Sequence, residues 1–175
     1  MRIIRGKYKG RRIKAPKVIK ARPTTDFAKE SLFNILGNEY DFEGLEVLDL
    51  FTGIGSISLE FGSRGAKKID AVDIEFRSVK FINEIAAEME LPIRAYKNNA
   101  FSYLAKPHST YDIIFADPPY GMDGLDKIPA LVFEHKMLNE GGTLIIEHEK
   151  RTDLSNHPNY IRTKSYGKVN FSFFE

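Results

Sequence analysis

The chain has 175 residues, of which 26 are Lys or Arg and 24 are Asp or Glu, so its formal net charge is +2. Its hydrophobic content of 42% excludes a disordered chain, and its length fits one domain of about 100–200 residues. The lack of cysteine excludes disulfides and thiolate metal sites. No apolar run reaches the roughly 20 residues that span a bilayer, and no signal-peptide pattern follows the basic N-terminus. We therefore expect a cytoplasmic protein without a membrane partner.

The charges are distributed unevenly along the chain. Residues 1–22 contain ten basic and no acidic side chains, a net charge of +10. The rest of the chain has 16 basic and 24 acidic residues, a net charge of −8. The ten basic residues are Arg2, Arg5, Lys7, Lys9, Arg11, Arg12, Lys14, Lys17, Lys20 and Arg22. An asymmetry of this kind favours an anionic partner, such as a nucleic acid, at the basic end.

The first expected element is a short hairpin over residues 2–14, in which Gly6 and Gly10 make the turns and the cations lie on the open face. Pro16 and Pro23 indicate a linker after it. We therefore divide the chain into a basic N-terminal arm, residues 1–22, and a folded domain, residues 23–175.

A helix is expected at the start of that domain. Thr24, Thr25 or Asp26 can cap it, and its apolar stripe runs from Ala28 to about Gly37. Strands are then expected at 45–51, 69–74, 93–96, 111–116, 143–147, 160–165 and 169–174, and helices at 56–64, 75–90 and 125–138. Apolar strands that alternate with helices predict a parallel α/β sheet covered on both faces, and the last two strands predict an antiparallel hairpin at one edge.

Glycines follow the first strand of this expected sheet. Gly53 and Gly55 stand where the chain turns into the next helix, and glycine lets the backbone pass close to a ligand. Asp73 ends the next strand, 24 residues after Asp49, a spacing at which an acidic residue can hold ribose hydroxyls. The same pattern fits a tight turn with a surface carboxylate, or a dinucleotide site. Because Ser58 replaces the third glycine and Asp49 would repel a pyrophosphate, the turn favours a nucleoside-type cofactor with a positive charge, such as S-adenosylmethionine.

A rigid corner, Asp117-Pro118-Pro119-Tyr120, follows the fourth strand. Two prolines fix φ and remove two backbone donors, which leaves the Asp117 carboxylate and the Pro118 carbonyl as acceptors and Tyr120 as a flat ring. Two acceptors and a stacking ring suit the exocyclic amino group of a base. The alternative is a proline-rich turn with an incidental tyrosine. No His or acid cluster with ligand spacing predicts a metal site.

Several stretches in order along the chain resemble one family. They are Arg5-Gly6, Lys9-Gly10-Arg11, Arg22–Asp26, Asp49–Gly55, Asn99-Ala100 and Phe115–Tyr120. With them the chain resembles class I S-adenosylmethionine-dependent methyltransferases, and more narrowly the RsmD-type enzymes that methylate guanine N2 in small-subunit (16S) ribosomal RNA. The resemblance implies a Rossmann-like, mostly parallel sheet of seven strands with an antiparallel last strand, and a catalytic role for residues 23–175. The chain departs from the family at Phe27 and Lys29.

The resemblance implies a cofactor site of eight residues: Thr25, Asp49, Gly53, Gly55, Asp73, Ile74, Asn99 and Ala100. Asp49 and the two glycines would line the methionine end, Asp73 would hold the ribose with Ile74 against the adenine, and Asn99 would lie at the adenine edge. The stretch from Arg22 to Asp26 would close over the cofactor. Asp117, Pro118 and Tyr120 would hold the target guanine.

The basic arm is expected to bind the RNA phosphates through Arg5, Lys9, Arg11, Arg12, Lys14 and Arg22. A solvated charged tail is the alternative, and the arm lacks the amphipathic helix of a membrane-binding segment. An unstacked base in a loop or single strand of an assembling small ribosomal subunit would be the acceptor of a monomeric enzyme.

Three other functions stay open: an adenine-N6 methyltransferase on DNA or RNA, a non-catalytic RNA-binding module with a vestigial cofactor pocket and, more remotely, a dinucleotide oxidoreductase. The four histidines are interpreted as surface or structural residues. Glu147 and Glu149 are interpreted as a solvated strand end rather than as part of a pocket.

Overall fold

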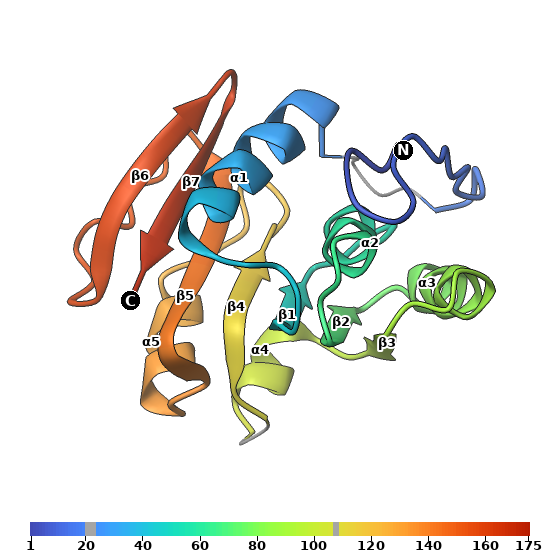
Figure 1. The fold of residues 1–175 in the computed structure, drawn as a ribbon. Coiled ribbons are helices and arrows are strands. Elements are labelled where there is room, and N and C mark those ends of the chain that lie inside the picture. Colours follow the sequence, from blue (N-terminus) through green and yellow to red (C-terminus); the bar gives the residue numbers. More distant parts are fainter. Residues whose placement is uncertain (20–23, 107–108) are drawn as a thin grey trace.

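The computed structural model describes residues 1–19, 24–106 and 109–175. Its helices are α1 (Asp26–Glu39), α2 (Ser56–Ser63), α3 (Phe76–Glu88), α4 (Ala100–Leu104) and α5 (Lys127–Glu134). Its strands are β1 (Glu46–Leu50), β2 (Lys68–Asp73), β3 (Ile93–Lys97), β4 (Tyr111–Ala116), β5 (Leu138–Glu149), β6 (Tyr160–Tyr166) and β7 (Val169–Phe174). The predicted α/β alternation is therefore confirmed (Figure 1).

The strands form one seven-stranded sheet in the order β3-β2-β1-β4-β5-β7-β6. Strands β1 to β5 pair in parallel, and β7 pairs antiparallel with both β5 and β6. The mostly parallel sheet with an antiparallel last strand, predicted from the sequence, is confirmed. The strand order reverses between β1 and β4, and in such sheets the crevice for a ligand lies at the carboxyl ends of the strands on either side of that point.

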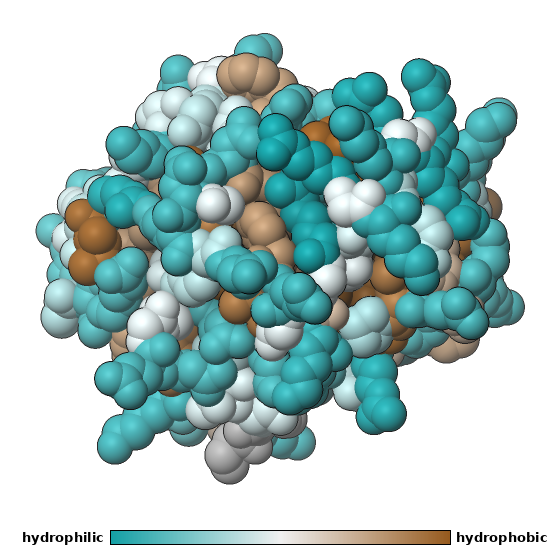
Figure 2. Space-filling view, viewed as in Figure 1, coloured by the Kyte–Doolittle hydropathy of each residue, from teal (hydrophilic) through white to brown (hydrophobic). Residues whose placement is uncertain are grey.

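Two layers of helices bury the sheet. Helices α1, α2 and α3 pack on one face, where Leu32, Phe61 and Ile82 belong to a single core cluster with residues of β1 to β3. Helices α4 and α5 cover the other face, where Leu104 and Val132 belong to a second cluster. In the view of Figure 2 the surface is mostly hydrophilic, with small separate hydrophobic patches. None of the helices in the described ranges has the length and apolarity to cross a membrane.

The structure differs from the prediction in three places. Helix α5 ends at Glu134 rather than at 138, because Lys136 takes a left-handed φ of 50° that breaks the helix, and β5 begins at Leu138. The short α4 was not predicted, since one turn and a half leaves no periodic pattern. The expected hairpin over residues 2–14 is shorter than predicted. Its arms pair antiparallel around a bridge between Arg2 and Arg12, with Ile3 N donating to Arg11 O at 3.0 Å, whereas N–H groups between the arms, such as that of Ile4, bond to α2.

The N-terminal segment, residues 1–19, packs on α1, α2 and α3 (Figure 1). Ile3 and Ile13 are buried in the first core cluster. The carboxylate of the buried Glu60 accepts the backbone N–H groups of Ile4 at 2.8 Å and Arg5 at 3.0 Å. The alternative of a solvated charged tail is therefore wrong for residues 1–19. The segment is held to α2 by its backbone and its isoleucines, and most of its cations stay exposed to solvent.

Candidate active site

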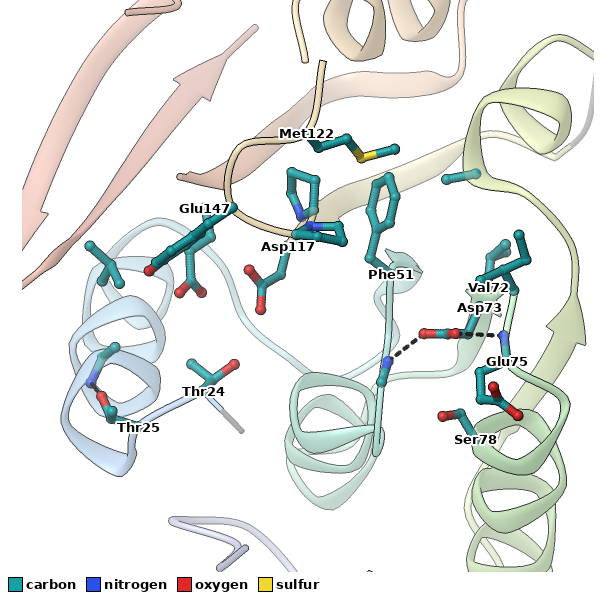
Figure 3. Close-up of a pocket in the computed structure, with 18 of the residues that line it drawn as sticks. Thr24, Thr25, Phe51, Val72, Asp73, Glu75, Ser78, Asp117, Met122 and Glu147 are labelled. Atoms are coloured by element: carbon teal, nitrogen blue, oxygen red, sulfur yellow. Dashed lines mark hydrogen bonds between the residues drawn. The ribbon is translucent and has the colours of Figure 1, made fainter. Parts of the chain in front are cut away.

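A cavity of about 740 Å³ opens at the carboxyl ends of the parallel strands, where the strand order reverses. Its walls come from the start of α1, the turn after β1, the ends of β2 to β5 and the turn between β6 and β7. Figure 3 shows two groups of carboxylates in it, with Asp73 and Glu75 on one side of Phe51 and Asp117 and Glu147 on the other. A volume of this size suits a small-molecule ligand together with part of a second one.

The glycine turn after β1 forms one wall of this cavity. The N–H of Gly53 donates to Asp73 Oδ2 at 2.8 Å, which ties the turn to the end of β2 (Figure 3). Gly53 lines the cavity, whereas Gly55 is the left-handed N-cap of α2, with φ of 77°. A Cβ added at Gly55 would lie 2.9 Å from Ile82 Cγ1, so this glycine permits the close packing of α2 on α3.

Asp49 lies behind the turn and is 1% exposed. Its Oδ2 accepts hydrogen bonds from Thr52 Oγ1 at 2.7 Å, from Ser58 N at 3.1 Å and from the Ser58 hydroxyl. Burial raises the pKa of this carboxyl to about 6, against the lowering effect of those donors. A side cavity of about 30 Å³, which shares Phe51 and Asp117 with the main cavity, reaches Asp49. A positively charged group in that recess would therefore meet a buried carboxylate.

Asp73 ends β2, Ile74 follows it, and both line the main cavity. Each carboxylate oxygen of Asp73 accepts a backbone N–H, from Gly53 and from Glu75, both at 2.8 Å. A carboxylate oxygen has two lone-pair sites, so both oxygens keep capacity for a ligand hydroxyl. Ile74 is 66% exposed and presents an apolar surface at the cavity rim.

The adenine edge predicted at Asn99 and Ala100 also faces the cavity. Asn99 is the N-cap of α4, and its Oδ1 accepts from Phe101 N and Ser102 N. Thr25 is likewise a cap, whose Oγ1 accepts from Ala28 N at 3.1 Å, and it lines the cavity from α1. Both side chains thus fix a helix start beside the cavity.

Asp117, Pro118 and Tyr120 form the opposite wall, together with Glu147 at the end of β5. Tyr120 is 38% exposed, so its ring is accessible from the opening. Glu147 is 4% exposed and points into the cavity near Asp117 (Figure 3). The interpretation of Glu147 as a solvated strand end is wrong, because β5 runs on to Glu149 and the Glu147 side chain is buried.

The sequence reasoning did not single out five other cavity residues: Phe51, Glu75, Ser78, Met122 and Tyr166. Thr24, from the stretch expected to close over the cofactor, also lines the cavity. Glu147 carried a signal, since it follows an apolar strand whose carboxyl end lies at the same edge as that of β4. Tyr166 carried none, because the sequence does not say where the tip of the last hairpin points. Phe27, which departs from the family pattern, lines the cavity beside Tyr166, with ring centroids 6.4 Å apart.

The expected RNA-binding cations lie outside the cavity, in the N-terminal segment. Arg5, Lys9, Arg12 and Lys14 are exposed, and Arg11 forms an ion pair with Glu88 of α3. Arg22 and His108 lie outside the described residues. His148 is buried against Ser172, with an Nε2–Oγ distance of 2.7 Å, which fits its structural interpretation. Within the described ranges, no group of three His, Cys, Asp or Glu residues could hold a metal ion.

Comparisons with known proteins connect this geometry to a family. The family described as conserved hypothetical protein 95 matches residues 1–175. The ribosomal RNA small subunit methyltransferase D of Buchnera aphidicola subsp. Baizongia pistaciae is 31% identical over 179 aligned positions, covering 99% of this chain and 91% of that protein. The structure of the hypothetical protein TTHA0928 of Thermus thermophilus has a TM-score of 0.85 at 25% identity, covering 100% and 99% of the two chains.

A more distant structure shares the fold. The T. thermophilus 16S rRNA N2 G1207 methyltransferase (RsmC), solved in complex with AdoMet and guanosine, has a TM-score of 0.70 at 22% identity, covering 89% of this chain and 44% of that one. The fold is therefore that of the class I methyltransferases, as predicted. The full-length family match and the near full-length relative show that this chain belongs to the RsmD-type family of ribosomal RNA small subunit methyltransferases.

Proposed function

We propose that the protein transfers a methyl group from S-adenosylmethionine to the exocyclic N2 amine of a guanine in small-subunit ribosomal RNA. The observation that carries this proposal is the shared cavity, in which Asp117 and Glu147 lie opposite Asp73 and Asn99. One end of the cavity thus suits a nucleoside, and the other offers acceptors for an amino group. The family and the AdoMet and guanosine bound by the RsmC structure support both assignments.

The residues fit S-adenosylmethionine at the first end. Val72, Ile74 and Phe51 give apolar walls for a base, and Asp73 has acceptor capacity for ribose hydroxyls. Asp49, in the adjoining recess, suits the ammonium of the methionine part. Among the described residues that line the cavity, Lys168 in the turn between β6 and β7 is the one cation. A single cation is little to balance the charge of two phosphates, so the cavity does not favour a ligand with a pyrophosphate. When bound, S-adenosylmethionine supplies an electrophilic methyl group.

The protein groups at the second end would prepare the amine. The lone pair of a guanine amine is delocalised into the ring, which makes it a weak nucleophile. The Asp117 carboxylate and the Pro118 carbonyl can accept its two hydrogens, favour a pyramidal nitrogen and so make its lone pair available. Tyr120 can stack on the base. The Asp117 carboxylate can accept a proton of the amine as the methyl group is transferred, because the amine becomes acidic only as it gains the methyl group.

Two carboxylates favour guanine over adenine. On the Watson–Crick edge of guanine the neighbour of the N2 amine is the N1–H donor, with the O6 acceptor beyond it, whereas on that of adenine the neighbour of the N6 amine is the N1 acceptor. A wall with both Asp117 and Glu147 offers acceptors to each guanine donor, and it would place a carboxylate against adenine N1. Adenine-N6 transfer is therefore the second candidate.

Mass analysis of nucleosides from the RNA of a deletion strain tests the proposal. We expect one N2-methylguanosine to disappear from small-subunit RNA and to return with the wild-type gene. Loss of N6-methyladenosine instead would support the second candidate, and unchanged RNA would contradict both. Calorimetry with S-adenosylmethionine distinguishes the enzyme from a non-catalytic RNA-binding module. If the protein is such a module, no binding is expected at about millimolar ligand.

We extend the proposal to the state in which the enzyme acts: a monomer, in the cytoplasm, on RNA within an assembling small ribosomal subunit. The purified protein should then methylate partly assembled particles from the deletion strain faster than the same RNA free of protein. The division into a basic arm and a catalytic domain belongs to the same proposal, with the arm holding phosphates while the cavity holds the base.

A further inference from the structure

A second open cavity, of about 1110 Å³, lies over β2 and β3 at the edge of the sheet. It is on the face that carries α4, opposite to the face on which residues 1–19 pack. Helix α4 has only five residues, so it covers little of this face, and β3 is the edge strand. We call this cavity the edge groove.

The edge groove is lined by cations in a protein body that is otherwise acidic. They are Lys67, Lys68, Arg94, Lys97 and Lys106, against the single carboxylate of Asp70. Asp70 is 4% exposed, lies 3.3 Å from Lys68 Nζ and accepts the Tyr111 hydroxyl at 2.8 Å. The rest of the chain after residue 22 has 16 basic and 24 acidic residues, so five cations to one acid is a local reversal of charge.

Three of these cations are available to a ligand. Lys67 is 3.6 Å from Glu46, and Lys68 is held by Asp70 and by Ser109 Oγ at 2.9 Å. Arg94, Lys97 and Lys106 are exposed, and no acidic side chain of the described residues forms an ion pair with them.

An exposed aromatic ring lies among them. Tyr96 follows Arg94 on the same face of β3 and is 39% exposed. Its ring is 6.3 Å from that of Tyr103, which belongs to a buried row with Tyr111 and Asp70. Burial and the bond to Asp70 raise the pKa of Tyr111, so it stays a protonated donor and holds the row together. Tyr96 thus has rigid support beneath an open ring face.

We propose that the edge groove binds a single-stranded stretch of the RNA substrate, with phosphates at Arg94, Lys97 and Lys106 and one base stacked on Tyr96. Cations that follow a backbone, combined with an exposed aromatic ring, are the usual means of binding unpaired nucleic acid. This inference rests on the proposed function. It also has a geometric basis, because Asn98 lines both the edge groove and the main cavity. The RNA would then be held on both faces of the sheet, by residues 1–19 and by the edge groove.

The test compares two triple variants with the same change in charge. The groove variant loses the three available cations of the edge groove through Arg94→Gln, Lys97→Gln and Lys106→Gln. The control variant loses three exposed cations elsewhere through Lys80→Gln, Lys136→Gln and Lys164→Gln. Binding of a single-stranded fragment of small-subunit RNA is measured against salt concentration. Each phosphate contact on a single strand contributes about 0.7 to the slope of log affinity against log salt concentration. The groove variant should therefore have a slope smaller by about 2. Its affinity near 0.1 M salt should be at least about tenfold lower. Tyr96→Ala should weaken binding about 5- to 100-fold with the slope unchanged.

S-adenosylmethionine affinity should be the same in all variants, which checks that the fold is intact. The proposal is overturned if the groove variant keeps the parent's affinity and slope, if the control variant loses as much, or if the parent binds no RNA. Equal RNA binding by parent and groove variant would leave a protein partner as the occupant. The RNA-binding assay does not depend on methyl transfer. Unchanged RNA modification in a deletion strain would therefore overturn the proposed function but not the binding of RNA in the edge groove.

Discussion

The two ends of the main cavity hold carboxylates in different ways. At the end formed by β1 and β2, Asp49 accepts from Thr52 and Ser58, and Asp73 accepts two backbone N–H groups. Both carboxylates fix the protein's own turn; Asp73 lines the main cavity, and Asp49 is reached through the adjoining recess. At the end formed by β4 and β5, Asp117 and Glu147 reach into the cavity as side chains (Figure 3). Substitutions at the first end should therefore change cofactor binding, and substitutions at the second should change transfer to the base.

The largest effect is expected from Asp117→Ala. If Asp117 accepts a hydrogen of the amine, its loss should lower the single-turnover rate of methyl transfer by about 100-fold or more, the size of effect seen when one preorganised polar group is removed from a reacting centre. Calorimetry should give a nearly unchanged Kd for S-adenosylmethionine, because the first end is intact.

Asp123→Ala is the matched control, since Asp123 is an exposed carboxylate in the same loop that does not line the main cavity. It should transfer at the parent rate. A near-normal rate for Asp117→Ala would remove the carboxylate from the mechanism, and a large loss of cofactor affinity would contradict the division of the cavity into two ends.

A smaller effect is expected from Glu147→Gln, which keeps the shape and removes the charge. A hydrogen bond to a charged group contributes about 1.5–3 kcal/mol, so kcat/KM for the guanine substrate should fall about 10- to 100-fold. Glu149→Gln, two residues further along the same strand and paired with Arg151, is the control and should change little. If Glu147→Gln leaves kcat/KM unchanged, the base is recognised without this residue.

The first end gives a pH dependence with a definite sign. The folded-state pKa of Asp49 is raised to about 6 from 3.8, so its contribution to stability is present below about pH 4 and is lost as the pH rises through about 6. The cationic cofactor should show the opposite trend, because ionised Asp49 attracts it. Between about pH 5 and pH 7 the affinity for S-adenosylmethionine should rise several-fold in the parent and stay flat in Asp49→Asn. A parallel rise in both proteins would show that another group is responsible.

The same contrast explains what could be predicted from the sequence. Asp49, Gly53, Asp73 and Asp117 lie at or just after the carboxyl ends of short apolar runs, so those runs and the parallel topology place them at one edge. Glu147 was misjudged because β5 runs on past it to Glu149 by pairing with β7, a contact of high sequence separation. The edge groove was invisible for the same reason, since its cations are spread from 67 to 106 and meet only when β2 and β3 pair.

The smallest effect on chemistry is expected from detaching the N-terminal segment. Gly6 and Gly10 share the same left-handed φ of 84°, but a Cβ at Gly6 would lie 1.9 Å from Ser63 O, whereas one at Gly10 meets nothing within 4 Å. Gly6→Ala and Gly10→Ala therefore carry the same backbone strain, and only the first adds a clash. Thermal unfolding should show Gly6→Ala to be less stable than Gly10→Ala by about 1–3 kcal/mol, the usual cost of overpacking.

The comparison of these two variants also tests whether the arm supports the cofactor end. The buried Lys29, 3.6 Å from Glu60, donates to Arg2 O at 2.6 Å and to Ser56 Oγ at 3.2 Å, and Ser56 begins the helix that follows the glycine turn. If this link only anchors the arm, Gly6→Ala should weaken RNA binding several-fold more than Gly10→Ala and leave the Kd for S-adenosylmethionine equal in both. If the Kd changes with the RNA affinity, the arm holds the turn in place, and the first end of the cavity depends on contacts beyond its own carboxylates.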